Sequence, residues 1–340
     1  MSWDKNYPSR TQRLIATMPL LARGWSYVLL LVFSLSTATA THSDTDVLIV
    51  SSADSPVYQS VISSLRTHLA SLCTGNEINC TLPKIKEAKL SNWSESIIGM
   101  HPNGVIITLG REAAKQVALS KKKNPHVINA LIPKAAVDQL NLNRSANRNT
   151  AIYLDQPIRR QLHLAAIANP GDRVGILLGP TTQQLKPLIA QEAIRLGIKI
   201  NYQNILKGET IGPLLKDLLG GSDILLALPD PLIYSRKNIF NILLSSYHSK
   251  VPVIGFSATY VKAGAIAAVY SSPEDIGHHL ADTINTMYQE GIEPTLHSHL
   301  SEHPKYFSVD VNKRVSRSLG INLPSNKEII KILSVKGEIK

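Results

Sequence analysis

Short apolar runs alternate with amphipathic segments along most of the chain, and the first example shows the pattern. Residues 47–50 are a continuous apolar run bounded by polar residues, which is typical of a strand buried on both faces. Residues 51–54 form a polar turn, Ser55 suits a helix N-cap, and Pro56 suits the first helical position. Apolar residues then recur at every fourth position from 57 to 69, which predicts a helix with one apolar face.

Further strands and helices follow in alternation, which predicts a parallel sheet covered by helices. The clearest strand is 104–109, which leads through Gly110 and Arg111 into a helix. The polar, asparagine-rich stretch 138–149 is expected to be a surface loop. The other elements predicted in this first series are strands at 82–90 and 126–131 and the helix at 112–119.

A second series of the same kind starts near residue 150. Gly197 suits a helix C-terminal cap, and Pro187 is expected to kink its helix or delay its start. Ser272 and Asp275 mark a strong helix start close to a capping box. Strands are predicted at 151–154, 173–178, 198–202, 223–228, 251–256, 265–270 and 306–309, and helices at 157–168, 183–196, 213–219, 235–249, 257–264, 273–290 and 312–319.

Two similar series, followed by a shorter segment able to return to the first, predict two lobes joined by several crossings. The fold class expected is α/β, with two Rossmann-like lobes, parallel sheets and a hinge. The predicted division is a signal peptide at 1–40, a first lobe at 41–148 plus 262–300, and a second lobe at 149–261 plus 301–340.

The first 40 residues are set apart from this fold. Basic residues at positions 10, 13 and 23 precede the apolar run 27–36, and an Ala-Thr-Ala site ending at Ala40 follows it. This order is typical of a secretory signal peptide, so we expect cleavage after Ala40 and a periplasmic location. An uncleaved anchor is the alternative, although the run has about ten residues and a membrane span needs about 20.

Basic residues outnumber acidic ones without forming a nucleic-acid-binding pattern. The net charge is +11, of which residues 1–40 contribute +3. Apart from the lysines at 121–123, the excess is scattered, whereas a nucleic-acid-binding protein concentrates it along one element. The triplet is either a solvated helix end or a contact patch, and no nucleic-acid partner is predicted.

The chain has two cysteines, Cys73 and Cys80, both beyond the predicted signal peptide. In an oxidising compartment they are expected to form a disulfide that closes a small loop after the first helix. Two inert thiols are the alternative. Two cysteines are too few for a structural zinc site.

The usual sequence motifs of catalysis are missing. The chain lacks a Gly-x-Ser-x-Gly elbow, a Walker loop, a Gly-x-Gly-x-x-Gly turn and a His-Glu-x-x-His motif, so neither an enzyme nor a cofactor is predicted. His297, His299, Glu302 and His303 are residue types that bind zinc. No predicted helix or strand fixes their geometry, and we expect a solvated loop rather than a metal site.

The most distinctive residues of the second series form a set of short motifs. They are Gln161-Leu162, the turn and strand at 169–175, Leu196-Gly197, the strand and turn at 223–230, the stretch VPVIGFSATYVKAGAIAAVY at 251–270, Gly277, and the closing segment 307–321. Together they resemble the ABC-transporter substrate-binding proteins with the type I periplasmic-binding fold. The resemblance covers mainly residues 153–322 and points to the subgroup associated with uptake of tryptophan and other aromatic amino acids.

This resemblance implies a solute-binding protein that closes on a small ligand, an amino acid or similar, and presents it to an ABC transporter. The implied partners are the ligand and a transporter permease or another membrane protein, and the chain is expected to be a monomer. Two first-lobe turns depart from the family: residues 51–58 lack its His-Pro turn, and residues 131–134 lack its Asp-Pro turn. The alternative is a periplasmic sensory or interaction subunit that has lost solute binding.

Ligands of open α/β sheets bind beyond the carboxyl ends of the strands, so the candidate residues follow predicted strands. Ser51 and Ser52 either offer hydroxyls to an anion beside a helix N-terminus or form a plain capped turn. Asp230 either binds an ammonium or hydroxyl group or is a turn aspartate between two prolines. Arg111 is either the partner of a ligand carboxylate or a solvated arginine. The predicted ligand-binding set is Ser51, Ser52, Tyr58, Thr108, Gly110, Gln156, Thr181, Asp230, Phe256, Ser257 and Tyr260.

Overall fold

The computed structural model describes residues 47–74, 82–92, 94, 104–120, 126–142, 149–169, 171–289 and 301–337. All the elements below lie within the compact unit Asp44–Lys340. The predicted signal peptide lies outside the described residues. So do Cys80 and the side chain of Cys73, and the disulfide between them therefore stays a prediction.

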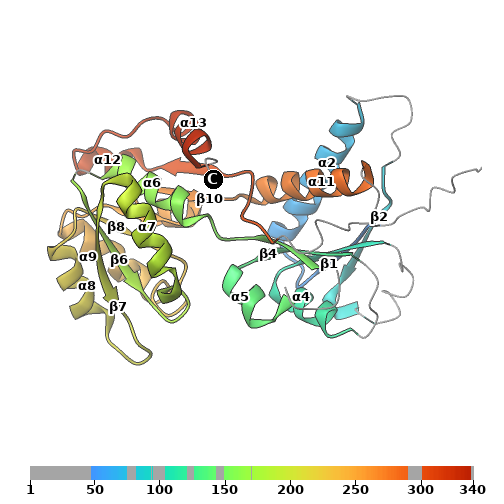
Figure 1. The fold of residues 1–340 in the computed structure, drawn as a ribbon, viewed down its shortest axis with the longest axis horizontal. Helices are drawn as coiled ribbons and strands as arrows, with labels where there is room; N and C mark the ends of the chain where they lie inside the picture. Colours follow the sequence, from blue (N-terminus) through green and yellow to red (C-terminus); the bar gives the residue numbers. More distant parts are fainter. Residues whose placement is uncertain are drawn as a thin grey trace, which may run out of the picture. The chain divides into compact units, whose positions relative to one another are not determined.

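The first half of the described chain builds one parallel sheet. Its strands are β1 (Val47–Ser51), β2 (Ile85–Lys89), β3 (Val105–Leu109), β4 (His126–Ile132) and β5 (Asn149–Tyr153). They lie in the order β2-β1-β3-β4-β5, and every neighbouring pair is parallel. Figure 1 labels β1, β2 and β4 of this sheet. The alternation of strands and helices in the sequence predicts this sheet.

Helices cover both faces of the first sheet. They are α2 (Pro56–Thr74), α4 (Arg111–Ala118), α5 (Lys134–Gln139) and, from much later in the chain, α11 (Pro273–Gln289). Val47 and Ile49 of β1 pack into the core under α2 and α11, whereas Leu48 and Val50 pack under α4. Because successive strand residues point to opposite faces, the apolar run of β1 is buried on both sides, as predicted.

The second half builds another sheet, in the order β11-β10-β9-β8-β6-β7. All neighbouring pairs are parallel except β10 with β11. Helices α6 (Ile158–Ala168), α7 (Lys186–Leu196) and α13 (Asn326–Gly337) share one core with this sheet, and α8 (Ile211–Gly220), α9 (Ile239–His248) and α10 (Ala258–Ala263) share the other. The strands are β6 (Arg173–Leu178), β7 (Lys199–Asn204), β8 (Ile224–Leu226), β9 (Val253–Gly255), β10 (Ala267–Tyr270) and β11 (Ser308–Val311), and α12 (Lys313–Ser318) follows β11.

Two strands lie in a different sheet from the one that the sequence-based boundaries give them. The boundary at 148 places residues 149–153 in the second lobe, yet β5 pairs in parallel with β4 of the first sheet. The boundary at 261 returns the chain to the first lobe, yet β10 pairs with β9 of the second sheet. A short apolar run looks the same at the end of one sheet as at the start of the next, so periodicity does not locate the crossing.

The boundaries of several helices follow the predicted signals. Gly197 adopts a left-handed conformation (φ 66°) at the C-terminus of α7, and Pro187 lies in its first turn. Ahead of α11, the Ser272 amide donates to Asp275 Oδ2 (2.8 Å) and the Asp275 amide donates to Ser272 Oγ (3.1 Å). This reciprocal pair is a capping box, which satisfies two amides of the helix start.

Three segments carry the chain between the sheets. The first is 154–157, from β5 to α6, and the second is Ser271-Ser272, from β10 to α11. The third is 301–307, which precedes β11. Within it, Glu302 forms a parallel bridge to Ile152 of β5, so this segment is anchored to the edge of the first sheet. These segments are called the crossing segments below.

Candidate functional site

A cavity of about 420 Å³ is lined by residues from both sheets. Apart from His303, the lining comes from the segments that follow β3, β4, β5, β6, β8 and β9. These are the carboxyl ends of parallel strands, where open α/β sheets bind their ligands. The topology therefore gathers residues from distant parts of the sequence around one space.

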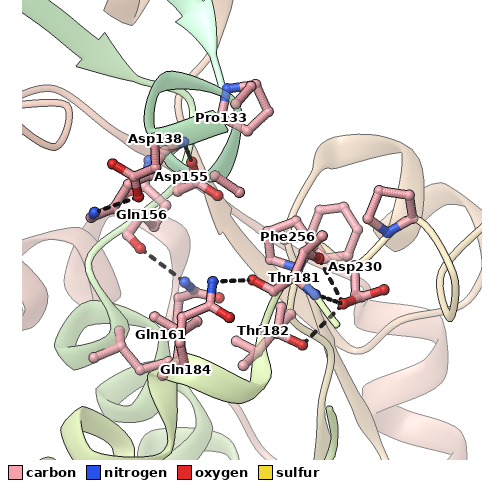
Figure 2. Close-up of a pocket in the computed structure, with 18 of the residues that line it drawn as sticks. Pro133, Asp138, Asp155, Gln156, Gln161, Thr181, Thr182, Gln184, Asp230 and Phe256 are labelled. Carbon is pink, nitrogen blue, oxygen red and sulfur yellow. Dashed lines mark hydrogen bonds and ion pairs between the residues drawn. The ribbon is translucent and has the colours of Figure 1, made fainter. Parts of the chain in front are cut away.

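Asp230 is the most heavily hydrogen-bonded side chain of the cavity wall (Figure 2). Its Oδ2 accepts from the Thr181 amide (3.1 Å), Thr181 Oγ1 (2.6 Å) and Thr182 Oγ1 (3.2 Å). Its Oδ1 accepts from the Leu232 amide (3.0 Å), and the residue is 2% exposed. The carboxylate thus joins the turn after β6 to the turn after β8. A Cβ on Gly179 would lie 2.6 Å from the carboxylate, so glycine leaves room for this approach.

A second charged group lies in the segments after β4 and β5. The Lys134 amide donates to Asp155 Oδ2 (2.6 Å), and Lys134 Nζ pairs with Asp138 Oδ2 (3.0 Å). Burial alone would lower the pKa of Lys134, but the bond to Asp138 and the nearby Asp155 raise it. Lys134 therefore stays charged and is paired with Asp138.

Arg111 is a cation on the cavity wall with a different environment. It is the first residue of α4, and among the described residues no hydrogen bond or ion pair engages its exposed guanidinium. The positive end of the helix dipole lies at the same place. The cavity therefore offers an incoming anionic group a guanidinium that needs no displacement of an acidic partner.

Apolar side chains complete the wall. Phe256, Ile158, Leu185 and Leu188 line the cavity from four different segments. Tyr234 joins them, with its ring in edge contact with Phe256 (6.0 Å between centroids). Such a surface suits the hydrocarbon or aromatic part of a small ligand.

Two polar atoms of the lining residues are buried without a partner among the described residues. They are the Tyr234 hydroxyl and Gln161 Oε1. Burial, then the nearby Tyr260 and Asp230, raises the pKa of Tyr234, so its hydroxyl keeps its proton. Gln161 Nε2 donates to the Gln156 carbonyl (2.9 Å), which fixes the orientation of its amide.

Of the residues predicted from sequence, the structure brings four together in this cavity: Gln156, Thr181, Asp230 and Phe256. Arg111, weighed as a carboxylate partner, lines it as well. The side chain of Gln156 is hydrogen-bonded to Ser271 and Arg160, whereas those of Thr181 and Asp230 are bonded to each other. Their part in ligand binding remains a proposal.

The other predicted first-lobe residues lie outside the cavity lining. Ser52 Oγ donates to the Leu109 carbonyl (2.8 Å) and accepts from the Ala113 amide (2.9 Å), so it caps α4 from another segment. Thr108 is fully buried and donates to Asn129 Oδ1 (2.7 Å). Their hydroxyls hold the sheet and the helix start together.

Gly110, Tyr58 and Ser51 also have local roles. Gly110 has φ 89°, and a Cβ there would collide with the Tyr58 hydroxyl and Ser52 Oγ. Glycine thus permits both the conformation and the close approach of Tyr58. Ser51 lies at the end of β1 and lines a separate hollow of about 360 Å³.

In the second sheet, Ser257 and Tyr260 are likewise absent from the cavity lining. Ser257 is the residue before α10 and adopts an extended conformation. The Tyr260 hydroxyl donates to the Tyr234 carbonyl (3.0 Å), and burial raises its pKa to about 12. Tyr260 therefore supports the aromatic wall from behind, with its ring 4.3 Å from that of Phe256.

Sequence reasoning missed several lining residues. Lys134 and Asp138 lie on α5, a six-residue helix that is too short to show periodicity and that partly overlaps the predicted loop. Leu185 and Leu188 flank Pro187 at a helix start. The sequence does indicate a position for Tyr234, because Pro-Asp-Pro predicts a turn just before it. In the structure the Tyr234 amide donates to the Asp230 carbonyl (2.9 Å) in that turn.

The described residues contain no cluster of three or more side chains suited to hold a metal ion. His297 and His299 of the zinc candidate lie outside them. Glu302 pairs with His279 (3.0 Å), whereas His303 Nδ1 bonds to the Asp155 carbonyl (2.9 Å). Across the described helices, none combines the length and apolar character needed to cross a membrane.

Solved structures with a similar fold come from several bacteria. A conserved domain protein from Vibrio cholerae has 18% identity and a TM-score of 0.52, covering 85% of this chain and 98% of its own. The ABC domain from Streptococcus pneumonia in complex with L-Trp has 17% identity and a TM-score of 0.54, with coverage of 85% and 98%. A ligand-free, open substrate-binding protein with adhesive properties from Clostridium difficile has 14% identity and a TM-score of 0.62, with coverage of 83% and 97%.

The parallel sheets and these neighbours define the class of the protein: it has a periplasmic-binding-protein-like fold. The chain belongs to the ABC transporter substrate binding protein family, whose model matches residues 84–331. No curated protein sequence matches the chain significantly. The family and fold class predicted from the sequence motifs are confirmed.

Proposed function

We propose that the chain is the secreted, periplasmic binding component of an ABC transporter, and that its cavity binds an amino acid or a similar small ligand. The observation that carries the proposal is the cavity of about 420 Å³ at the carboxyl ends of strands from both sheets. Its size lies in the range of small-molecule sites, roughly 300–1,000 Å³. Ligand binding would draw the lobes together about the crossing segments, and the closed form would be read by the permease.

The chemistry of the wall fits a zwitterion with an apolar side chain. Arg111 suits a carboxylate, because its guanidinium is exposed at the N-terminus of α4. Asp155 suits an ammonium group, because the bond that its side chain makes among the described residues is to a backbone amide and not to a cation. Phe256, Leu185 and Leu188 suit the apolar side chain. The structural neighbour from Streptococcus pneumonia, which was solved with L-Trp, supports the same ligand class.

The test is a thermal-shift screen of the purified protein over amino acids and related small molecules. A ligand that binds only the folded state at 100 times its Kd stabilises it by about 2.7 kcal/mol, so Tm rises. Calorimetric titration of the best ligand then compares Arg111→Gln with Arg236→Gln. Both variants remove one exposed guanidinium, but Arg236 does not line the cavity.

We expect Arg111→Gln to weaken binding at least tenfold and Arg236→Gln to leave the Kd unchanged. Equal Kd values for the two variants would contradict the role of Arg111. If no compound raises Tm, the amino-acid proposal fails.

The alternative, a sensory or interaction subunit without a solute, is favoured by one observation. Ser52 and Thr108, the predicted first-lobe hydroxyls, are engaged by internal hydrogen bonds. A protein of this kind would show no ligand-dependent rise in Tm. It would still retain a membrane or envelope partner in a pull-down, and this retention would survive Asp230→Ala.

A further inference from the structure

A chain of hydrogen bonds joins all three crossing segments. Gln156 Nε2, in the first segment, donates to Ser271 Oγ in the second (2.9 Å). Ser271 Oγ donates in turn to the Tyr306 carbonyl in the third (2.7 Å). The Ser271 hydroxyl therefore acts as acceptor and donor at once, an arrangement in which each bond polarises the next.

Arg160 of α6 links the first and third crossing segments a second time. Its Nη1 donates to Gln156 Oε1 (2.7 Å) and to the Pro304 carbonyl (3.2 Å). Its guanidinium also lies over the ring of Phe307, 4.0 Å from the centroid. The first and third crossing segments are thus bonded to the same buried side chain, which is 8% exposed.

Gln156 lines the cavity, yet the amide atoms that a ligand would use are occupied. Its Oε1 accepts from Arg160 and its Nε2 donates to Ser271, while its backbone carbonyl accepts from Gln161. The residue is 6% exposed. Both amide atoms are thus engaged in bonds that link the crossing segments, and a ligand is left at most the second N–H and the second lone pair of a nearly buried amide.

We infer that Gln156 and Ser271 are positioning residues: they fix the crossing segments relative to one another and thereby set how the residues from the two sheets meet around a ligand. The inference rests on the proposed solute-binding function. Substitution of Ser271 distinguishes this role from direct ligand contact, because Ser271 belongs to the chain of hydrogen bonds but does not line the cavity.

The chain offers a matched control for Ser271→Ala. Ser222 Oγ also donates a 2.7 Å bond to a backbone carbonyl, that of Leu218, and lies beside α8 away from the crossing segments. Both variants remove one bond donated to a backbone carbonyl, and Ser271→Ala in addition removes the acceptor of Gln156 Nε2. Any additional effect of Ser271→Ala then reports on the crossing segments.

The experiment has two readouts, each made on the full chain. Without ligand, hydrogen–deuterium exchange is followed by mass spectrometry. We expect Ser271→Ala to raise exchange at 153–157 and 301–307 at least threefold, with no such change in Ser222→Ala. With the best amino acid from the thermal-shift screen, calorimetry should show about five- to tenfold weaker binding for Ser271→Ala alone.

The outcomes separate the positioning role from the proposed function. Unchanged exchange in Ser271→Ala overturns the positioning role, whether or not a ligand is found. A loss of affinity in Gln156→Ala with wild-type affinity in Ser271→Ala also overturns it, because Gln156 would then contact the ligand directly. Failure of every amino acid to bind the wild type contradicts the proposed function, while the exchange result still tests the link between the segments.

Discussion

At the scale of single residues, Asp230 shows what a sequence pattern can and cannot predict. Its place after a buried strand predicts that it reaches the ligand side of the sheet, and the structure places it on the cavity wall. The sequence does not show that its carboxylate accepts four hydrogen bonds from residues 181, 182 and 232. The donors of Thr181 and Thr182 come from another strand's turn, some 50 positions away in the chain, whereas the Leu232 amide belongs to the same turn as Asp230.

Asp230→Asn should therefore destabilise the fold itself. The amide can replace only one acceptor oxygen, which leaves donors of Thr181 and Thr182 facing an NH₂ group. We expect the free energy of unfolding to fall by about 1–3 kcal/mol, the cost of unsatisfied buried donors. Urea unfolding monitored by circular dichroism measures this, with Asp217→Asn on the exposed face of α8 as the control. Equal stabilities of the two variants would contradict this role of Asp230.

At the scale of elements, helices α2 and α11 were both predicted, but their contact was not. They pack side by side (Figure 1), although about 200 residues separate them in the sequence. Amphipathic periodicity tells which face of a helix is buried and not what covers it. The close approach depends on Gly277: a Cβ there would lie 2.7 Å from the Val61 carbonyl and 2.9 Å from the Leu65 amide nitrogen.

Gly277→Ala should force these two helices apart. Overpacking of this kind costs about 1–3 kcal/mol, because the obstructing atoms are two backbone atoms and the Cβ of Ser64, none of which can move without the helix. Differential scanning calorimetry should show a lower Tm than wild type.

Gly212→Ala is the matched control for Gly277→Ala. Gly212 is also helical, and a Cβ there has no neighbour within 4 Å. Because alanine is the better helix former, the control should be neutral or more stable by up to about 1 kcal/mol. A Gly277→Ala variant as stable as Gly212→Ala would show that the helix pair can relax.

At the scale of the whole molecule, the fold class follows from the alternation of strands and helices, whereas the path between the sheets does not. Pairing with β4 puts β5 in the first sheet, and pairing with β9 puts β10 in the second. No local sequence pattern reveals these pairing partners. The residues predicted for the site also fall into two groups, those that reach the cavity and those that do not. Thr181, Asp230 and Phe256 follow strands of the second sheet and reach the cavity, while Ser52 and Thr108 are used by the fold.

Asp282 of α11 links three distant parts of the chain and should make the stability of the fold depend on pH. Its carboxylate accepts from Lys305 Nζ (2.7 Å) and the Tyr306 hydroxyl (2.6 Å) in the third crossing segment and contacts His68 of α2 (3.2 Å). Burial alone would raise the pKa of Asp282, but the bonds from Lys305 and Tyr306 hold it below its usual value.

A carboxyl group with a depressed pKa in the folded state stabilises that state above the pKa it has when unfolded, about 3.9. This contribution is lost as pH falls through the lower, folded pKa. Urea unfolding at pH 6 should therefore show Asp282→Asn less stable than wild type, and the difference should shrink between about pH 4 and pH 2. A difference that stays constant with pH would contradict this account.

The packing of α11 on α2 has a consequence for the order in which the chain can fold. The core of the first sheet includes Ile276, Leu280 and Ile284, which are synthesised about 120 residues after β5 is complete. Contacts so distant in sequence form slowly, because a long loop must close before they are made. A nascent chain that has emerged only as far as β10 lacks α11, which leaves Val61 and Leu65 uncovered, and it also lacks β11 and α13, which complete the second sheet and its core. Both sheets therefore depend on residues after β10 for their completion, and neither core can close before that part of the chain has emerged.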